Sequence, residues 1–244
     1  MYNLLIALAI GALVTLLVKL SGFAIWAGLV PGFLVLVGAF VLLGRRVAMK
    51  VQGLSKLAEK ELSVQPANVR ERQQRMEKAI KILQDGLVYD RWQFLIGAEI
   101  HAQIGMIYYV AKNLEQAQQH FAKASPRNYM AKAMQGALYY QKKDYSNMEG
   151  AFEQAVKSGK KEAVVWAAYA WCLLQIKERE KALKVMARAV EINPTEEKLK
   201  AGLNALQNEK RLKMKPYEPL WWQFGLEQPP LQMTTNRRVQ FQRR

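Results

Sequence analysis

Apolar and polar positions divide this chain into two unlike parts. Residues 3–20 and 23–43 form two almost continuous apolar runs, with a short turn that includes Lys19 near their junction. About 20 apolar residues cross the hydrocarbon core of a bilayer, so the two runs together are too long for a single span. Backbone polar groups in lipid must be satisfied within the segment, which makes both spans helical. Residues 1–44 are therefore predicted to form a transmembrane hairpin.

Small residues along both runs favour close packing of the two helices. Gly11, Ala12, Gly28 and Gly38 are expected at the contact, and Pro31 is expected to kink the second helix. A cleaved signal peptide is the alternative interpretation of the first run. Such a peptide needs a basic segment ahead of its apolar core, and Met-Tyr-Asn carries no charged side chain. The absence of that segment favours the hairpin.

Basic residues gather where the second apolar run ends. Arg45, Arg46 and Lys50 lie just beyond it, whereas the turn between the runs has only Lys19. By the positive-inside rule, this asymmetry places both termini and the rest of the chain in the cytoplasm. The same three residues are predicted to bind anionic lipid headgroups, with about 1 kcal/mol per basic side chain close to the surface. Residues 45–67 are expected to form a basic juxtamembrane helix or linker.

Beyond this segment the apolar positions follow a helical period, and the pattern recurs. The repeated stretches are "IGMIYYVAKNLEQAQQHFAKA", "QGALYYQKKDYSNMEGAFEQA" and "YAWCLLQIKEREKALKVMARA". Phe121, Phe152 and Met186 are equivalent positions, spaced by 31 and then 34 residues. Small residues where two helices cross let the backbones approach, and a large residue one turn away fills the remaining gap. Helix pairs of this kind cannot bury their apolar faces alone, so they stack.

This spacing resembles the tetratricopeptide repeat, a helix pair with conserved large and small positions over about 34 residues. The third copy matches at Trp166, Ala170, Leu173, Ala182, Ala189 and Pro194. The first matches at Gly105, Tyr108, Ala117, Phe121 and Ala124, and the second at Gly136, Tyr139, Phe152 and Ala155. His101 and Lys132 depart from the pattern where Trp166 stands, and Met148 replaces the small Ala. The resemblance covers residues 68–194.

The flanks of the repeats complete an all-α prediction. Asn68 is expected to cap the first helix of the repeat region, just after Pro66. Residues 195–215 are predicted to form a terminal capping helix that begins at Thr195 and shields the last apolar edge of the stack. The predicted fold is thus a two-helix transmembrane hairpin followed by a short α-solenoid, a capping helix and an irregular tail at residues 216–244.

The resemblance implies that the first helix of each pair lines a concave groove for protein partners. The residues projected onto this face are Glu99, Met106, Tyr109, Tyr140, Gln141, Trp171 and Gln175. The face is apolar and aromatic, and it lacks the pair of cationic side chains that would grip a peptide carboxylate. The alternative is that Tyr140 and Trp171 are ordinary packing residues between helices.

The tail contains "KPYEPLWWQFGLEQPPLQ", an aromatic segment broken by prolines. Its expected anchors are Tyr217, Trp221, Trp222 and Phe224. Three destinations are open for them: the chain's own groove or solenoid, the bilayer interface, or the surface of another protein. Residues 234–244 are interpreted as a disordered basic end.

The composition shows a strong basic excess and argues against disulfide, metal and catalytic sites. The net charge is +16, and every acidic residue and every Lys or Arg except Lys19 follows residue 44. The single cysteine, Cys172, excludes an intrachain disulfide framework and is interpreted as a small buried hydrophobe. His101 and His120 have no Cys or acid at ligand spacing, and each is interpreted as an ordinary helix residue. We predict no enzymatic activity, no cofactor, no metal site and no small-molecule substrate.

Two functions remain from the sequence. The first is a membrane-anchored scaffold that recruits protein partners through its groove or tail, an architecture that resembles bacterial repeat proteins of the inner membrane. The second is a basic protein that binds anionic surfaces, either lipid headgroups or nucleic acid. Against nucleic acid, the aromatic residues are not interleaved with basic ones on a helix face, and no nucleic-acid-binding motif is present.

Overall fold

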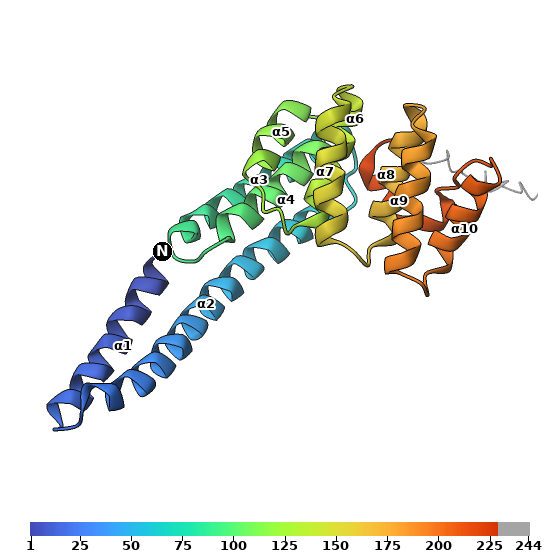
Figure 1. Ribbon diagram of the computed structural model, residues 1–244. Helices are drawn as coiled ribbons and strands as arrows, with labels where there is room; N and C mark the ends of the chain where they lie inside the picture. The colour runs from blue at the N-terminus through green and yellow to red at the C-terminus, as the bar shows by residue number, and fades with distance from the viewer. Residues whose placement is uncertain (229–244) are drawn as a thin grey trace, which may run out of the picture.

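The chain folds entirely into helices. The computed structural model describes residues 1–228, which hold ten α-helices and three short 3-10 helices, with no strand in that range. Figure 1 shows a helical hairpin that projects from one end of a stack of helix pairs. The predicted all-α class, with two apolar N-terminal helices ahead of a helical repeat region, is confirmed.

Helices α1 (Tyr2–Leu20) and α2 (Ile25–Ser63) form the hairpin and touch through small residues. A Cβ atom added to Gly11 would lie 2.8 Å from the carbonyl oxygen of Gly32, and one added to Gly28 would lie 2.9 Å from the carbonyl oxygen of Thr15. The Thr15 hydroxyl donates to the Gly28 carbonyl oxygen across the contact, at 3.2 Å. Gly38, which we expected at the contact, is exposed, and an added Cβ atom there would meet nothing within 4 Å.

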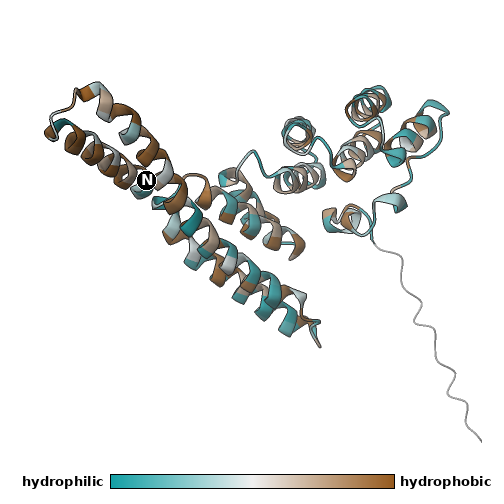
Figure 2. Cartoon of the chain, turned by 90° about the horizontal axis from the view of Figure 1, so that it is seen from below, coloured by the Kyte–Doolittle hydropathy of each residue, from teal (hydrophilic) through white to brown (hydrophobic). Residues whose placement is uncertain are grey.

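Both helices of the hairpin are long and apolar enough to cross a membrane. Buried residues make up 17% of the apolar window of α1 and 11% of that of α2, whereas the core helix of a globular protein would be mostly buried. Figure 2 shows that hydrophobic residues predominate in this part of the chain. Apolar side chains that are not packed against other protein groups are unfavourable in water. They are typical of helices that face lipid.

Helix α2 does not end where its apolar part ends. It runs through Pro31 and past Arg45 to Ser63 without a break, so the juxtamembrane helix predicted within residues 45–67 is a continuation of α2. After Pro31 the sequence has no further proline before Pro66, and good helix formers such as Lys and Glu follow the apolar part. At 1.5 Å per residue the helix is about 58 Å long. It therefore serves both as a predicted span and as the support of the repeats.

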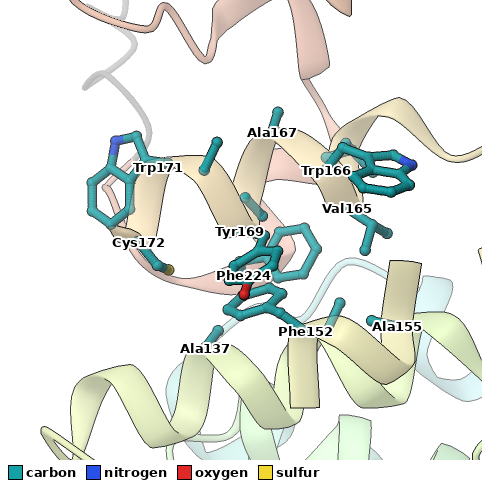
Figure 3. Close-up of a cluster of buried hydrophobic side chains, with 14 of the residues drawn as sticks. Ala137, Phe152, Ala155, Val165, Trp166, Ala167, Tyr169, Trp171, Cys172 and Phe224 are labelled. Atoms are coloured by element: carbon teal, nitrogen blue, oxygen red, sulfur yellow. The ribbon is translucent and has the colours of Figure 1, made fainter. Parts of the chain in front are cut away.

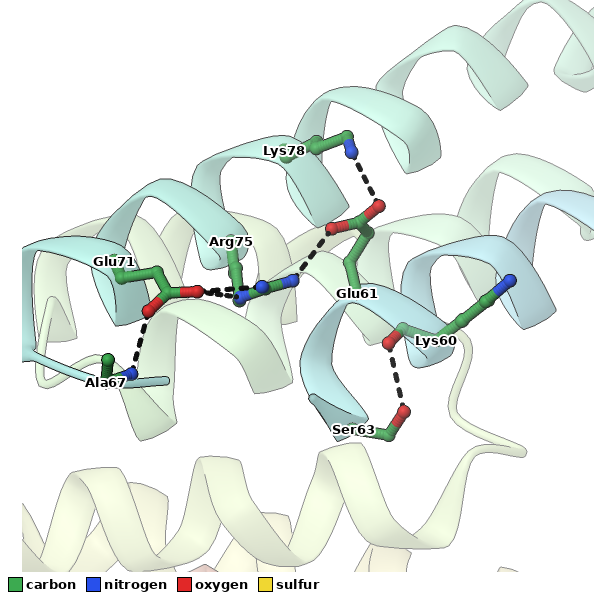
Figure 4. Close-up of polar contacts among 7 residues, drawn as sticks. All are labelled: Lys60, Glu61, Ser63, Ala67, Glu71, Arg75 and Lys78. Carbon is green, nitrogen blue, oxygen red and sulfur yellow. Dashed lines mark hydrogen bonds and ion pairs between the residues drawn. The ribbon is translucent and has the colours of Figure 1, made fainter. Parts of the chain in front are cut away.

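The outer half of α2 pairs with α3 (Val69–Asp85). Asn68 caps α3 as predicted, because its side chain accepts from the amide of Glu71 at 2.8 Å. Ion pairs also join the two helices: Glu61 lies 2.6 Å from Lys78 and 3.5 Å from Arg75 (Figure 4). Together the two helices form an additional helix pair at the start of the stack.

Three helix pairs follow a short 3-10 turn, η1 (Gly86–Arg91). The pairs are α4 (Ile96–Val110) with α5 (Leu114–Lys123), α6 (Tyr129–Gln141) with α7 (Tyr145–Ser158), and α8 (Ala163–Gln175) with α9 (Arg179–Ile192). The turn within each pair holds a lysine in the left-handed region, at Lys112, Lys143 and Lys177. These positions reproduce the spacing of 31 and 34 residues found in the sequence.

Small and large residues meet inside the pairs as the repeat pattern predicted. A Cβ atom on Gly105 would lie 2.8 Å from the ring of Phe121, and one on Gly136 would lie 2.6 Å from the ring of Phe152. Phe152 also stacks on Tyr169 of the next pair, with ring centroids 5.2 Å apart (Figure 3). The same aromatic ring therefore packs within one pair and against the next, which couples neighbouring repeats.

The terminal helix is shorter than predicted. Helix α10 spans Glu197–Gln207, and its N-cap residue is Glu196 rather than Thr195. Thr195 lies in a turn that the hydrogen bond from the Glu196 amide to the Asn193 carbonyl closes at 3.1 Å. The helix ends because Glu209 adopts a left-handed conformation, with φ of 56°. The chain then turns back toward the repeats.

Candidate functional site: the concave face and its resident segment

The face of the repeats that is predicted to be concave is covered in part by the chain itself. Residues 212–226, which we call the resident segment, include two 3-10 turns, η2 (Lys215–Tyr217) and η3 (Leu220–Phe224). Turn η3 packs against α6 and α8. The resident segment therefore occupies the middle of the predicted groove.

An aromatic row holds the first half of η3. Trp221 is 1% exposed, and its ring meets Trp171 edge to face with centroids 5.3 Å apart. Trp171 meets Tyr140 in the same manner at 5.8 Å. The Trp221 indole N–H donates to the carboxylate of Glu227 at 2.8 Å. The polar atom of this buried side chain is thus satisfied, while its ring packs on Trp171, which in turn packs on Tyr140.

A buried hydrogen bond holds the second half of η3. The Tyr109 hydroxyl donates to the backbone carbonyl oxygen of Phe224 at 2.5 Å and accepts from the Gln141 side-chain amide at 2.7 Å. Burial raises the pKa of Tyr109, so its hydroxyl stays protonated and remains a donor at neutral pH. Phe224 itself is fully buried. Tyr109, Gln141 and Trp171 therefore belong to one surface that recognises the chain's own tail.

Among the three destinations that the sequence left open, the tail takes its own groove and solenoid. Tyr217 is buried against α10, where its hydroxyl donates to the Lys198 carbonyl oxygen at 3.1 Å. Burial raises the pKa of Tyr217 to about 12. Trp222 is half-buried at the edge of the core. The basic end at residues 234–244 lies outside the described residues.

The remaining predicted groove residues belong neither to the aromatic row nor to the Tyr109 hydrogen bonds. Glu99 accepts a hydrogen bond from the Asn128 side chain at 3.0 Å, which joins α4 to the start of α6. Gln175 is exposed and borders a polar cavity of about 560 Å³ near the α8–α9 turn, together with Arg179. Met106 lines a different cavity. The seven projected residues are thus divided among the aromatic row, the Tyr109 hydrogen bonds, the α4–α6 contact and two cavities.

An open cavity of about 690 Å³ lies where the outer half of α2 and α3 meet the repeats. We call it the junction cavity. Met106 and Val110 of α4 and Met134 of α6 line one side, and Leu62 and Met76 line the other. Its edge nearest the groove is Gln223 of the resident segment. Methionine side chains adapt to irregular apolar partners, so the wall chemistry is suited to hydrophobic ligands of variable shape.

Charged side chains surround the apolar wall of the junction cavity. Arg75 lies 2.7 Å from Glu71 and 3.5 Å from Glu61, and both Glu61 and Arg75 border the cavity (Figure 4). The hydrogen bond from Lys78 holds the pKa of Glu61 below its usual range. Rim charges of both signs can orient a partner that buries apolar side chains at the centre.

The two histidines form a contact that the sequence did not indicate. His101 of α4 and His120 of α5 place their Nδ1 atoms 3.0 Å apart, so one nitrogen donates and the other accepts. Burial lowers the pKa of both imidazoles, the positive charge of Lys123 lowers both further, and Asp90 partly opposes the shift at His101. The pair is stable with one shared proton between the two nitrogens, and a second proton would abolish the hydrogen bond.

This pair predicts a loss of stability in mild acid. The pKa values of the folded state lie below those of the unfolded state, so the stabilisation is present above the unfolded pKa and is lost as pH falls through the folded values. We expect the free energy of unfolding to decrease from about pH 7 to about pH 5, where histidine titrates. In urea unfolding, His120→Gln should flatten this dependence, and the exposed Gln119→Ala on the same helix should keep the wild-type slope. Equal slopes for all three proteins would contradict the assignment.

The structure also places the single cysteine, the possible metal ligands and the basic residues of α2. Cys172 is fully buried, as predicted, and burial raises the pKa of its thiol, which makes it a poor nucleophile. Within residues 1–228, no cluster of three or more metal-ligating side chains is present. Arg45, Arg46 and Lys50 are exposed on α2, directly beyond its apolar half. Their role in binding headgroups remains a prediction.

Comparison with known sequences supports the repeat assignment for one copy. A profile of the tetratricopeptide repeat matches residues 163–196. This range covers α8, α9 and the start of the following turn, which is the copy with the most complete pattern in the sequence. No curated protein matches the chain. Repeats of this type are protein-interaction modules with concave binding surfaces, so the match points to a protein-interaction role.

Proposed function

We propose that this protein is a non-enzymatic scaffold, anchored in a bacterial inner membrane by α1 and α2, that presents its repeats to protein partners in the cytoplasm. The tetratricopeptide match supports protein interaction. The two exposed apolar helices support the anchor, and the basic residues Arg45, Arg46 and Lys50 at their open end support the orientation. The unbroken α2 carries the repeats away from the bilayer.

The junction cavity is the proposed partner site, and it is the observation that carries this function. It is open and apolar, and both the repeats and the α2–α3 pair contribute to it. Three large apolar side chains stay exposed around it, with exposed fractions of 41% for Leu62, 42% for Val64 and 39% for Val110. An exposed apolar patch with a charged rim is typical of a protein-docking surface.

A partner would bind the junction cavity at a lower free-energy cost than the part of the groove that the resident segment fills. Full burial of a large apolar side chain stabilises a fold by about 1.5–3 kcal/mol, and the resident segment buries both Trp221 and Phe224. A partner that entered the filled part would first lose this stabilisation. The junction cavity needs no such displacement, so the resident segment acts as a fixed wall beside it.

Val110→Asp tests this site. The added carboxylate would have to be buried without a partner, so we expect capture of the proteins bound there to fall about tenfold or more, which corresponds to 1.4 kcal/mol. The measurement is affinity purification of the full-length chain from membranes, with quantitative mass spectrometry. The matched control is Ile192→Asp on α9, at a site of similar exposure (42%) away from the cavity. Equal recovery of every bound protein by the two variants would rule out the cavity as the partner site.

A further inference from the structure

The turn that joins α3 to α4 exposes large apolar side chains that the proposed scaffold function does not use. Val88 is 68% exposed, Trp92 is 39% exposed and Phe94 is 59% exposed, all within ten residues of one another. Exposed apolar surface is unfavourable in water by about 25 cal/mol per Å². A cluster of this kind therefore marks a surface that another apolar phase covers.

The position of this turn relative to the hairpin identifies that phase. The Asn3 amide donates to the Trp92 carbonyl oxygen at 3.2 Å, and the Asn3 side chain donates to the Gln93 side chain at 3.0 Å. The Tyr2 and Trp92 rings meet edge to face, with centroids 5.3 Å apart. The turn is thus fixed to the first residues of α1, as Figure 1 also shows near the N-terminus.

The turn is also level with the end of the apolar half of α2. The Gln93 side chain lies against Gly44, so close that a Cβ atom there would be 3.1 Å from its amide nitrogen. Gly44 is the last residue before Arg45 and Arg46. Gln93 thereby closes the open end of the hairpin between its two helices, and Trp92 and Phe94 lie on either side of Gln93 in the chain.

The charges at this level suit an anionic lipid surface. Arg45, Arg46, Lys50 and Arg91 are exposed. The acid in the turn, Asp90, accepts a hydrogen bond from the Gly97 amide at 3.2 Å and so is held toward the start of α4. Basic side chains near the surface attract anionic headgroups, while tryptophan is favoured at the boundary between headgroups and acyl chains.

We propose that Val88, Trp92 and Phe94 form a second membrane contact, which inserts into the interfacial layer of the bilayer that the hairpin spans. The 3-10 turn limits its depth: irregular backbone keeps unpaired polar groups, which water can satisfy in the interface but lipid tails cannot. With the hairpin and this turn both in the bilayer, the repeat stack cannot rotate freely about the hairpin axis. The inference rests on the proposed membrane anchor.

Spin labels at four sites test it. Phe94→Cys and Val88→Cys report on the turn, Leu34→Cys on the lipid-facing side of the hairpin, and Tyr145→Cys on the exposed surface of α7. Cys172 is fully buried, and the unmodified protein shows whether it takes up label. The full-length variants are placed in nanodiscs of phosphatidylethanolamine and phosphatidylglycerol. Power-saturation spectra then compare collisions with oxygen, which is enriched in lipid, and with a water-soluble nickel chelate.

The possible results distinguish a failure of the second membrane contact from a failure of the proposed anchor. We expect a high oxygen-to-nickel collision ratio at residue 34, a low ratio at residue 145, and intermediate ratios at residues 88 and 94. A high ratio at 34 with ratios at 88 and 94 as low as at 145 would overturn the second contact and leave the anchor intact. A low ratio at 34 would overturn the anchor itself, and the second contact with it.

Discussion

Trp221→Ala is expected to lower the free energy of unfolding of the repeat stack by about 3–5 kcal/mol, the usual cost of removing a large buried aromatic side chain. Trp221 is 1% exposed and packs on Trp171, and its indole N–H is bonded to Glu227. Deletion of this ring leaves a cavity between the resident segment and α8, and it also exposes Trp171. Urea unfolding of the full-length protein in detergent, followed by far-UV circular dichroism, measures the change.

The neighbouring Leu220→Ala is the matched control. Leu220 lies in the same 3-10 turn but is 39% exposed. Its truncation should therefore lower the free energy of unfolding by much less than the truncation of Trp221. A chain that ends at residue 215 lacks the whole of η3 and should melt at a lower temperature than the full chain. The resident segment would not be part of the stable fold if Trp221→Ala and Leu220→Ala were equally stable. The same would follow if the shortened chain melted at the same temperature as the full chain.

Gly136→Ala is expected to destabilise the protein by about 1–3 kcal/mol, the usual cost of overpacking a core. The new methyl group would lie 2.6 Å from the Phe152 ring. This ring cannot move aside easily, because it is fully buried and stacks on Tyr169 at 5.2 Å. The same unfolding measurement checks the prediction.

Gly150→Ala makes the same chemical change on the paired helix α7, where an added Cβ atom meets nothing within 4 Å. Alanine is favoured over glycine in a helix interior by about 0.5–1 kcal/mol, so this variant should be more stable than the wild type. The two substitutions are thus expected to have opposite signs. If both variants were more stable than the wild type, helix propensity, and not the fit between Gly136 and Phe152, would set the outcome. If both were less stable, the prediction for Gly150 would be contradicted.

Much of the repeat region could be predicted because its pattern is local and recurs. The spacing of Gly105, Gly136 and their partner phenylalanines predicts two helices that cross at a small residue, and the structure shows both contacts. The apolar character of residues 3–20 and 23–43 likewise predicts two long helices. The residues projected onto the concave face included Tyr109, Gln141 and Trp171, which do contact or support the resident segment.

Other features depend on contacts that have no local signature. The continuity of α2 beyond residue 44 has no local signal, because a change from apolar to basic residues does not show whether a helix ends or continues. The helix pair formed by the outer half of α2 and α3 builds one wall of the junction cavity, so that cavity was missed as well. The His101–His120 contact joins two helices whose rotations about their axes decide whether the rings meet.

The sequence by itself determined the elements of this protein: two apolar helices, a recurring helix pair, and an aromatic tail without helical periodicity. Those properties follow from side chains a few residues apart, which set helix propensity and the face that must be buried. Only the tertiary structure decided where the tail lies and what closes the open end of the hairpin. Tyr109 and Phe224 are 115 residues apart, and Asn3 and Gln93 are 90 apart. Contacts at such separations depend on how all the intervening helices stack, and no spacing in the sequence records that arrangement.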